Sequence, residues 1–155
     1  MISSRLTRRD SLLFVYGTLR PFVDIEMARW LREHARYLGA ATTPGRLYDL
    51  GAYPGMRAAR GRRERVVGDV YRVTDARVFR VLDRYEATFV RERCVVSLER
   101  GGRRVAWAYR YRYRVASAAR IASAAWTASF VCQGFASSAP KSARNPSPRS
   151  FATWP

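Results

Sequence analysis

The sequence has few residues of the kinds that bind metals or form disulfides. It holds two cysteines, Cys94 and Cys132, and one histidine, His34, among 155 residues. The cysteines lie far apart and form no CxxC pair, so no metal-ligand set is predicted and we expect neither a metal nor a cofactor. The same scarcity argues against Ser-His-Asp and Cys-His catalysis, because the single histidine falls on the solvated side of a predicted helix.

Long hydrophobic runs are also missing. No stretch of 18 or more apolar residues occurs, so no transmembrane helix is predicted. The run from Leu12 to Val15 is too short for the apolar region of a signal peptide. We therefore expect a cytoplasmic location, whose reducing conditions disfavour a disulfide, although a structural one stays the alternative. Cys94 is predicted to be a small core residue.

Acidic residues and lysine are scarce as well. Lysine and arginine total 29 against 12 for aspartate and glutamate, the net charge is +17, and Lys141 is the only lysine. This charge predicts nonspecific, salt-sensitive adsorption to nucleic acid. A physiological nucleic-acid role is the alternative. It is less favoured because the arginines are scattered, and because a GC-rich coding sequence gives the same arginine and alanine bias.

The length suits one domain with a real core. We expect a flexible N-terminus over residues 1–11, a folded domain over 12–128 and a disordered tail over 129–155. In the tail Ser, Ala, Pro and Asn dominate, and no hydrophobic periodicity survives.

Apolar periodicity predicts alternating strands and helices along the domain. The first expected elements are a strand over 12–16 and a helix over 24–38, which Asp24 caps and Gly39 ends. Turn-rich chain over 40–68 follows, with a short strand at 45–50 and an exposed basic hairpin or loop at 57–65. The remaining elements are a strand over 66–73, a helix that Thr74 or Asp75 caps and that runs to Tyr85, and a strand over 93–98.

The clearest strand is predicted over residues 104–115, after a hairpin turn at Gly101-Gly102. Aromatic and valine residues alternate there with arginines and alanines. We expect the aromatic residues to face the core and the arginines and alanines to face outward. A basic, aromatic nucleic-acid face is the alternative. It is less favoured because stacking and charge would have to share one face.

The stretch from Phe14 to Arg20 is a first candidate site. An apolar strand breaks at Gly17, a residue that allows unusual turns, and Thr18 adds a hydroxyl. A strand that ends in such a turn can bind an anion with its backbone N–H groups. On local chemistry alone, a simple turn is the alternative.

Glu86 is the second candidate, at the point where the second predicted helix ends between Tyr85 and Phe89. A carboxylate among aromatic rings loses hydration, which raises its pKa and makes it a better proton carrier near neutral pH. The alternative is an ordinary surface glutamate paired with Arg84, Arg91 or Arg93.

Four motifs occur in order along the chain: Val15-Tyr16-Gly17-Thr18-Leu19-Arg20, Tyr53-Pro54-Gly55-Met56, Val67-Gly68-Asp69-Val70-Tyr71 and Leu82-Asp83-Arg84-Tyr85-Glu86. In this order and spacing they resemble the gamma-glutamylcyclotransferase-like family over roughly residues 12–126. The resemblance implies an α+β fold, a small mixed β-barrel flanked by helices.

The resemblance also implies a function, a metal-independent cyclisation of the acyltransferase or lyase type. A small-molecule gamma-glutamyl amide would release 5-oxoproline and an amine, with Glu86 as the general acid and base. The loop of Tyr16, Gly17, Thr18 and Leu19 would hold the glutamyl end, and Arg20 would add charge there or have no role. The alternative is a non-catalytic binding domain on the same scaffold for an anionic ligand or nucleic acid.

The sequence departs from the family pattern at two places. Ala87 follows Glu86 where the family usually has glycine, and Ser123-Ala124-Ala125-Trp126 stands where the family usually has Ser-Gly-Asp-Trp. Losing a turn former and a hydrogen-bond acceptor predicts a looser closing edge of the domain.

Overall fold

The computed structural model describes residues 11–126. Almost all of the predicted flexible N-terminus, the whole predicted tail and Cys132 lie outside the described residues. The elements in chain order are β1 (Ser11–Val15), α1 (Glu26–His34), β2 (Arg36–Pro44), β3 (Arg46–Asp49), β4 (Pro54–Arg57), β5 (Arg65–Val73), α2 (Ala76–Tyr85), β6 (Phe89–Leu98), β7 (Arg103–Tyr111), the 3-10 turn η1 (Ser117–Ala119) and β8 (Arg120–Ile121).

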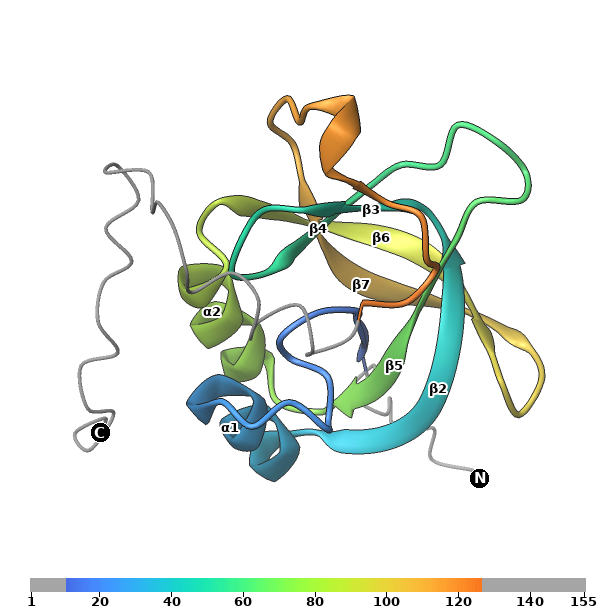
Figure 1. Cartoon of the computed structure of the whole chain (residues 1–155). Helices are drawn as coiled ribbons and strands as arrows, with labels where there is room; N and C mark the ends of the chain where they lie inside the picture. Colours follow the sequence, from blue (N-terminus) through green and yellow to red (C-terminus); the bar gives the residue numbers. More distant parts are fainter. Residues whose placement is uncertain (1–10, 127–155) are drawn as a thin grey trace, which may run out of the picture.

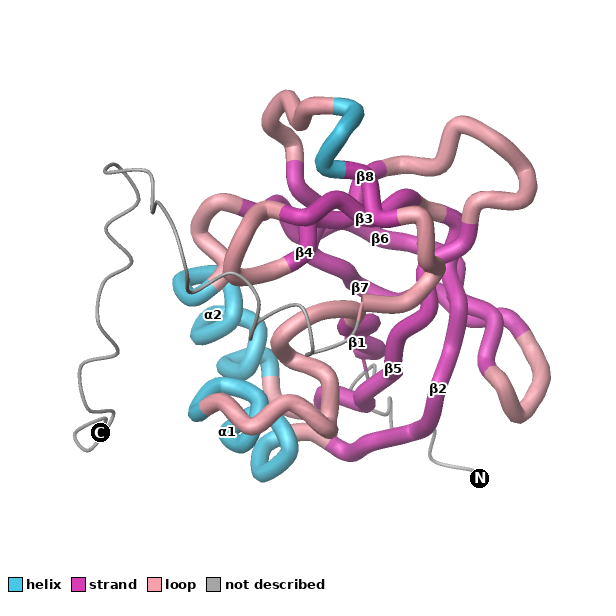
Figure 2. Tube along the Cα trace, viewed as in Figure 1, coloured by secondary structure: helices cyan, strands magenta, loops and turns pink. Residues whose placement is uncertain are grey.

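Five strands close into a barrel in the order β1-β5-β2-β6-β7. The neighbours along this order pair antiparallel, and the barrel closes where β1 meets β7 in parallel, with Leu13 opposite Trp107. A second sheet, β4-β3-β8, lies across one end, while α1 and α2 pack beside the barrel (Figures 1 and 2). The predicted fold class, an α+β barrel flanked by helices, is confirmed.

Two hydrophobic clusters lie on opposite sides of the barrel wall. One fills the barrel and its covered end, and includes Phe14, Tyr16, Val70 and Cys94. The other joins the outer face of β1, β5 and β7 to side chains of both helices, such as Leu31 of α1 and Leu82 of α2. Because strand residues point alternately to the two sides, β1 and β5 are apolar on both faces.

The prediction for residues 24–38 is wrong at both ends. The helix covers only Glu26–His34, Asp24 forms an ion pair with Arg29 at 3.7 Å instead of a cap, and β2 starts at Arg36. Pairing of β2 with β5 along its length outweighs the local helical pattern. Gly39 lies inside β2 next to a register shift, at φ 136°, where glycine avoids strain.

The chain from Ala40 to Gly68 holds more strand than predicted. The short strand near 45–50 is confirmed as β3, but β2 extends to Pro44 and β4 adds a second strand at Pro54–Arg57. Pro54 and Gly55 are weak strand formers, so local propensity gave no sign of β4. It forms because it pairs with β3 along four residues.

The predicted facing of residues 104–115 is right for Trp107 and Tyr109, which pack in a core cluster, but wrong for the alanines. Ala106 and Ala108 point into the barrel and are 2% and 0% exposed, while Tyr109 packs in the helix-side cluster. The interior of a five-stranded barrel is narrow and already holds large rings such as Phe14, so small side chains fit this inner face. The strand also ends at Tyr111, which leaves Tyr113 62% exposed.

The second helix matches its prediction and places Glu86. Asp75 caps α2 by accepting the Arg77 N–H at 2.9 Å, and this bond is the largest cause that lowers the pKa of Asp75. The helix then runs to Tyr85, so that Glu86 is its C-cap. The predicted Gly101-Gly102 turn joins β6 to β7, both glycines having positive φ.

The altered closing segment is attached to the barrel. The Val67 N–H donates to the Ala124 carbonyl at 2.8 Å, and Trp126 is 2% exposed within the barrel cluster. The tryptophan is therefore buried without the usual Gly-Asp pair before it. Neither helix within residues 11–126 has the length and apolar character needed to cross a membrane. The expected cytoplasmic location stays a prediction.

Candidate active site at the end of the second helix

The loop after β1 is a tight turn packed against the second sheet. The Arg20 N–H donates to the Gly17 carbonyl at 3.1 Å, which closes the turn. A Cβ at Gly17 would lie 2.8 Å from Pro54 Cγ, so glycine permits this close approach. Within residues 11–126, the N–H groups of Gly17, Thr18 and Leu19 donate no hydrogen bond to the protein. These donors can therefore bind a ligand oxygen.

Tyr16 joins the loop to two other elements. Its hydroxyl donates to the Tyr109 carbonyl of β7 at 2.6 Å and accepts the Met56 N–H of β4 at 3.1 Å. The side chain is 6% exposed, and burial raises its pKa, with a further upward contribution from the charge of Glu86. Tyr16 therefore stays protonated at neutral pH and holds the start of the loop in place.

The loop is also tied to the end of α2. Burial raises the pKa of the Tyr85 hydroxyl, and the Thr18 side chain lies close enough to that group to lower it. Leu19 is 4% exposed and belongs to the cluster that contains α1 and α2 side chains. Position 18 therefore lies beside the residue that precedes Glu86, and the two candidate stretches meet in space.

Glu86 is held by its backbone at the C-cap of α2. Its N–H donates to the Leu82 carbonyl and its carbonyl accepts the Phe89 N–H, both at 2.8 Å. The residue is half-buried, and burial raises the pKa of its carboxyl group to about 7. Such a group is part protonated and part ionised at neutral pH.

Three tyrosines lie within range of the charge of Glu86. Burial is the largest cause that raises the pKa of Tyr16, Tyr85 and Tyr109, and the charge of Glu86 raises each further. These residues follow β1, end α2 and lie in β7. The charge of Glu86 is therefore felt at the loop, at the helix end and at the barrel wall.

Two of the arginines considered as partners for Glu86 are engaged elsewhere. Arg91 pairs with Asp83 at 3.4 Å and lies over the Phe79 ring. Arg93 lies over the indole of Trp107, 5.1 Å from its centroid. Burial is the cause of the raised pKa of Glu86, with no cation lowering it. Arg91 and Arg93 are therefore occupied by other groups, and pairing with Arg84 stays the alternative.

Arg20 is drawn toward β5 and away from solvent. Its Nε donates to Asp69 Oδ2 at 2.7 Å, and the two side chains are 11% and 5% exposed. The Tyr37 hydroxyl donates to the other Asp69 oxygen at 2.9 Å. Arg20 thus anchors the far end of the loop. Its ion pair with Asp69, together with the Tyr37 hydrogen bond, explains how an acidic residue is accommodated in a buried strand.

A hollow of about 280 Å³ lies beside the end of α2, lined by Asp83, Phe89, Val90, Arg91 and Tyr109. The Tyr109 hydroxyl donates to Asp83 Oδ1 at 2.7 Å in its wall. The loop from Tyr16 to Leu19 does not line this hollow. Glu86 does not line it either.

The sequence did not point to several residues of this junction. Tyr109 looked like one of many aromatics in an alternating strand, and Asp69 like one residue of a strand motif. The only signal was their place inside motifs or periodic runs, because the contacts span 93 residues for Tyr16 and Tyr109 and 49 for Arg20 and Asp69. Among the described residues, no cluster of three or more His, Cys, Asp or Glu side chains is arranged to hold a metal ion.

Comparison with known proteins identifies the family and the fold. The profile of the family described as gamma-glutamyl cyclotransferase, AIG2-like, matches residues 13–128. The chain belongs to this family. No curated protein sequence matches it significantly.

Solved structures share the fold. An AIG2-like protein from Mus musculus aligns with a TM-score of 0.64 at 21% identity, over 77% of this chain and 89% of that one. YkqA from Bacillus subtilis aligns with a TM-score of 0.62 at 25% identity, over 76% of this chain and 39% of that one, so this chain spans less than half of YkqA. A structure titled gamma-glutamyl cyclotransferase aligns with a TM-score of 0.52 at 15% identity, over 66% of this chain and 67% of that one.

Proposed function

We propose that the protein is a gamma-glutamyl cyclotransferase, which releases 5-oxoproline and an amine from a small gamma-glutamyl amide. The observation that carries the proposal is the Glu86 carboxyl group, whose pKa burial raises to about 7 beside the loop after β1. Membership of the gamma-glutamyl cyclotransferase, AIG2-like family supports the same chemistry.

In this reaction the substrate supplies its own nucleophile. The α-amine attacks the γ-carbonyl carbon, so a new C–N bond closes a five-membered ring. The original amide C–N bond then breaks, and its nitrogen leaves as an amine. The amine that attacks must lose a proton and the nitrogen that leaves must gain one. One group that accepts and then donates a proton therefore balances the whole reaction.

Glu86 is the group proposed for both transfers. With a pKa of about 7, a large fraction of the carboxyl groups is ionised at neutral pH and can accept the proton of the attacking amine. The acid that forms is then strong enough to protonate the leaving nitrogen. A carboxyl group with an ordinary pKa of 4.5 would be a weaker base and would hold the proton less well.

The loop is proposed to bind the glutamyl end of the substrate. Gly17, Thr18 and Leu19 would donate their N–H groups to the substrate carboxylate or to the oxyanion that develops on the γ-carbonyl. Tyr16 would fix the loop through its bonds to β7 and β4. Arg20, whose charge Asp69 balances, would hold the far end of the loop. Holding the substrate folded in this way lowers the activation free energy by several kcal/mol or more in well-oriented intramolecular cyclisations.

The variant Glu86→Gln tests this proposal, because glutamine keeps the size of the side chain but neither gains nor loses a proton near neutral pH. Mass spectrometry would measure 5-oxoproline released from a panel of gamma-glutamyl amides. General acid and base catalysis contributes about 10²–10⁴-fold, so we expect a loss in that range.

The control is Glu33→Gln, which removes an exposed carboxylate from α1 and should keep full activity. Far-UV circular dichroism would establish that both variants are folded. A Glu86→Gln protein that released 5-oxoproline as fast as the parent would exclude Glu86 from the mechanism.

A further inference from the structure

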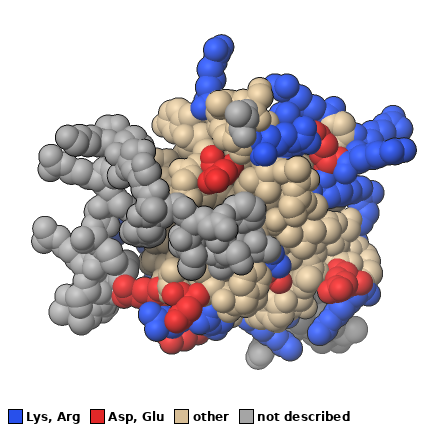
Figure 3. All heavy atoms as spheres, in the orientation of Figure 1, with Lys and Arg blue, Asp and Glu red and all other residues tan. Residues whose placement is uncertain are grey.

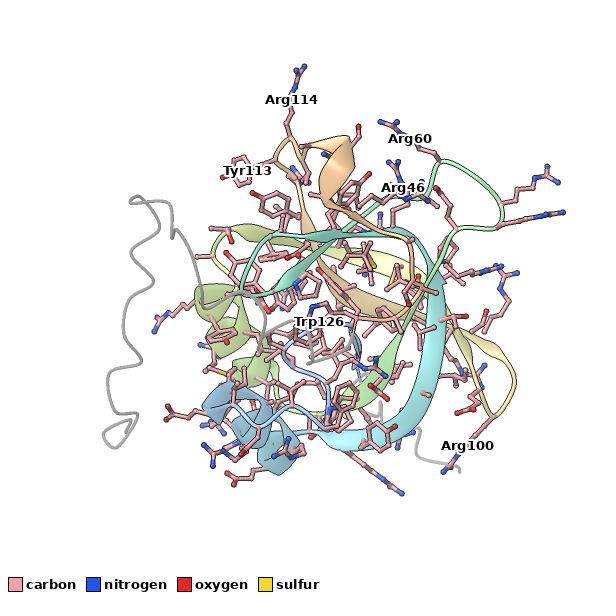
Figure 4. The ribbon with its side chains drawn as sticks, viewed as in Figure 1. Arg46, Arg60, Arg100, Tyr113, Arg114 and Trp126 are labelled. Carbon is pink, nitrogen blue, oxygen red and sulfur yellow. The ribbon has the colours of Figure 1, made fainter. Side chains whose placement is uncertain are left out.

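Positive charge collects at one end of the molecule, on the loop between β4 and β5 and the chain that follows β7. We name this surface the arginine end. Figure 3 shows blue side chains gathered at the upper right of the molecule, and Figure 4 shows Arg46 and Arg60 on the right of this end, Tyr113 on its left and Arg114 at its top. Its members are Arg46, Arg57, Arg60, Arg62, Arg63, Arg114, Arg120 and Tyr113.

Glu64, the acid of this loop, is engaged in holding the loop together. Its Oε2 accepts the N–H groups of Arg60 and Gly61 at 2.6 and 3.0 Å, and these bonds and the nearby arginines lower its pKa. Its Oε1 pairs with Arg120 at 2.6 Å, while Arg46 lies 3.7 Å from Oε2. The carboxylate is thus saturated and cannot neutralise further cations.

The remaining arginines of the loop stay uncompensated. Arg60, Arg62, Arg63 and Arg114 are exposed, and no carboxylate within residues 11–126 forms an ion pair with them. Three of them follow one another closely on one short loop. Like charges held this close produce a positive potential that attracts polyanions.

An exposed aromatic ring, that of Tyr113, lies at the same end of the molecule as these arginines. Tyr113 is 62% exposed, and its carbonyl accepts a hydrogen bond from Arg57 Nη1 at 2.9 Å. Its ring centroid lies 5.5 Å from that of Tyr111, which in turn lies 5.5 Å from that of Phe89. The Tyr113 ring therefore packs edge-to-face against Tyr111 while most of its surface stays exposed.

We propose that the arginine end binds single-stranded nucleic acid, with the arginines on the phosphates and an unpaired base on Tyr113. Positive charge beside an accessible aromatic ring is how proteins bind single strands without sequence preference. Duplex would hide the base faces, and an acidic peptide would leave the aromatic ring without a use. The surface is independent of Glu86 and of the proposed reaction.

The first test compares two ways of removing the same charge from the full chain. One variant replaces Arg60, Arg62 and Arg63 with glutamine. The control replaces Arg100, Arg103 and Arg104 with glutamine. These three arginines are exposed on the hairpin between β6 and β7. Fluorescence anisotropy would follow labelled oligouridylate and oligothymidylate, about 16 nucleotides long, over a range of salt concentrations.

We expect the first variant to lose affinity at least tenfold at physiological salt and to reduce the salt slope by about 2, as expected for three lost phosphate contacts. The control should lose less than threefold, and Glu86→Gln should bind like the parent. Equal losses in the two arginine variants would mean that total charge alone binds the strand, and would overturn the proposal.

A second test isolates the stacking contact. Tyr113→Ala should weaken binding about fivefold or more, whereas Tyr113→Phe, which keeps the ring, should bind like the parent. Equal binding by Tyr113→Ala, or displacement of the strand by polyglutamate as readily as by unlabelled strand, would contradict the proposed partner. Neither variant alters a buried side chain, so both are expected to fold.

Discussion

At the residue scale, the candidate site depends on what happens to individual carboxyl groups. Asp69 is 3% exposed but is satisfied by Arg20 and Tyr37. Glu86 is half-buried without a cation that lowers its pKa, so its pKa rises. The first arrangement fixes structure, and the second leaves a proton mobile near neutral pH.

Asp69→Asn should strongly destabilise the fold. It would leave the guanidinium of Arg20, only 11% exposed, without its counter-charge. Removing one partner of a buried pair costs about 3–5 kcal/mol, and the asparagine amide would recover part of this, so we expect about 2–4 kcal/mol. Urea denaturation at neutral pH would measure the free energy of unfolding.

Asp24→Asn is the matched control, because Asp24 and Arg29 form an exposed pair at 3.7 Å. Such pairs contribute about 0–1 kcal/mol. Similar free energies of unfolding for the two variants would show that Asp69 and Arg20 are not held as a buried pair.

At the element scale, β1 and β5 approach each other closely enough to require glycine. A Cβ at Gly68 would collide with the Val15 carbonyl oxygen and lie 2.6 Å from Phe14 Cζ. Gly68→Ala should therefore displace β1, whose end carries the loop. Overpacking of this kind costs about 1–3 kcal/mol. The thermal unfolding midpoint would report the loss.

Gly61→Ala provides the comparison, since nothing lies within 4 Å of a Cβ at Gly61. Its midpoint should stay within error of the parent or rise slightly, because alanine restricts the unfolded chain. A Gly68→Ala protein as stable as Gly61→Ala would contradict the close approach of the two strands.

Local patterns predicted those elements whose ends are set by nearby residues. Asp75 caps α2 from within its own turn, and Gly101-Gly102 makes a hairpin that needs no distant partner. The boundary at Arg36 could not be predicted, because the pairing of β2 with β5 decides it. The prediction for the inner face of β7 was wrong for the same reason, because the wall of a closed barrel covered by helices is apolar on both sides.

The candidate site likewise combines residues that the sequence identifies with contacts that the sequence does not predict. Residues 16–19 and Glu86 stand in short motifs, so resemblance to a family was enough to select them. The hydrogen bonds of Tyr16 to β7 and β4, and of Arg20 to Asp69, join segments far apart in sequence. No periodicity encodes such contacts. Only the folded chain reveals them.

At the scale of the whole molecule, the raised pKa of Glu86 is a property of the assembled fold. The tyrosines around the carboxyl group come from three separate parts of the chain. In the unfolded chain these rings disperse, and the carboxyl group returns to its ordinary pKa of 4.5. Folding therefore takes up a proton at Glu86 between about pH 4.5 and 7.

The sign of the effect on stability follows from this difference. Between these pH values the unfolded chain has released the proton while the folded chain still holds it, so stability falls as pH rises. The loss is complete above about pH 7, and a shift of this size corresponds to about 3 kcal/mol. Glu86 thus opposes folding at neutral pH.

The most direct test is the titration of the Glu86 carboxyl group by NMR. Carboxyl carbons would be labelled with ¹³C, and the Glu86 signal assigned by its loss in Glu86→Gln. The account predicts a midpoint near pH 7 in the folded protein and near 4.5 in urea. A midpoint near 4.5 in the folded protein would contradict it, because an ordinary exposed carboxylate could not carry the proposed proton transfers.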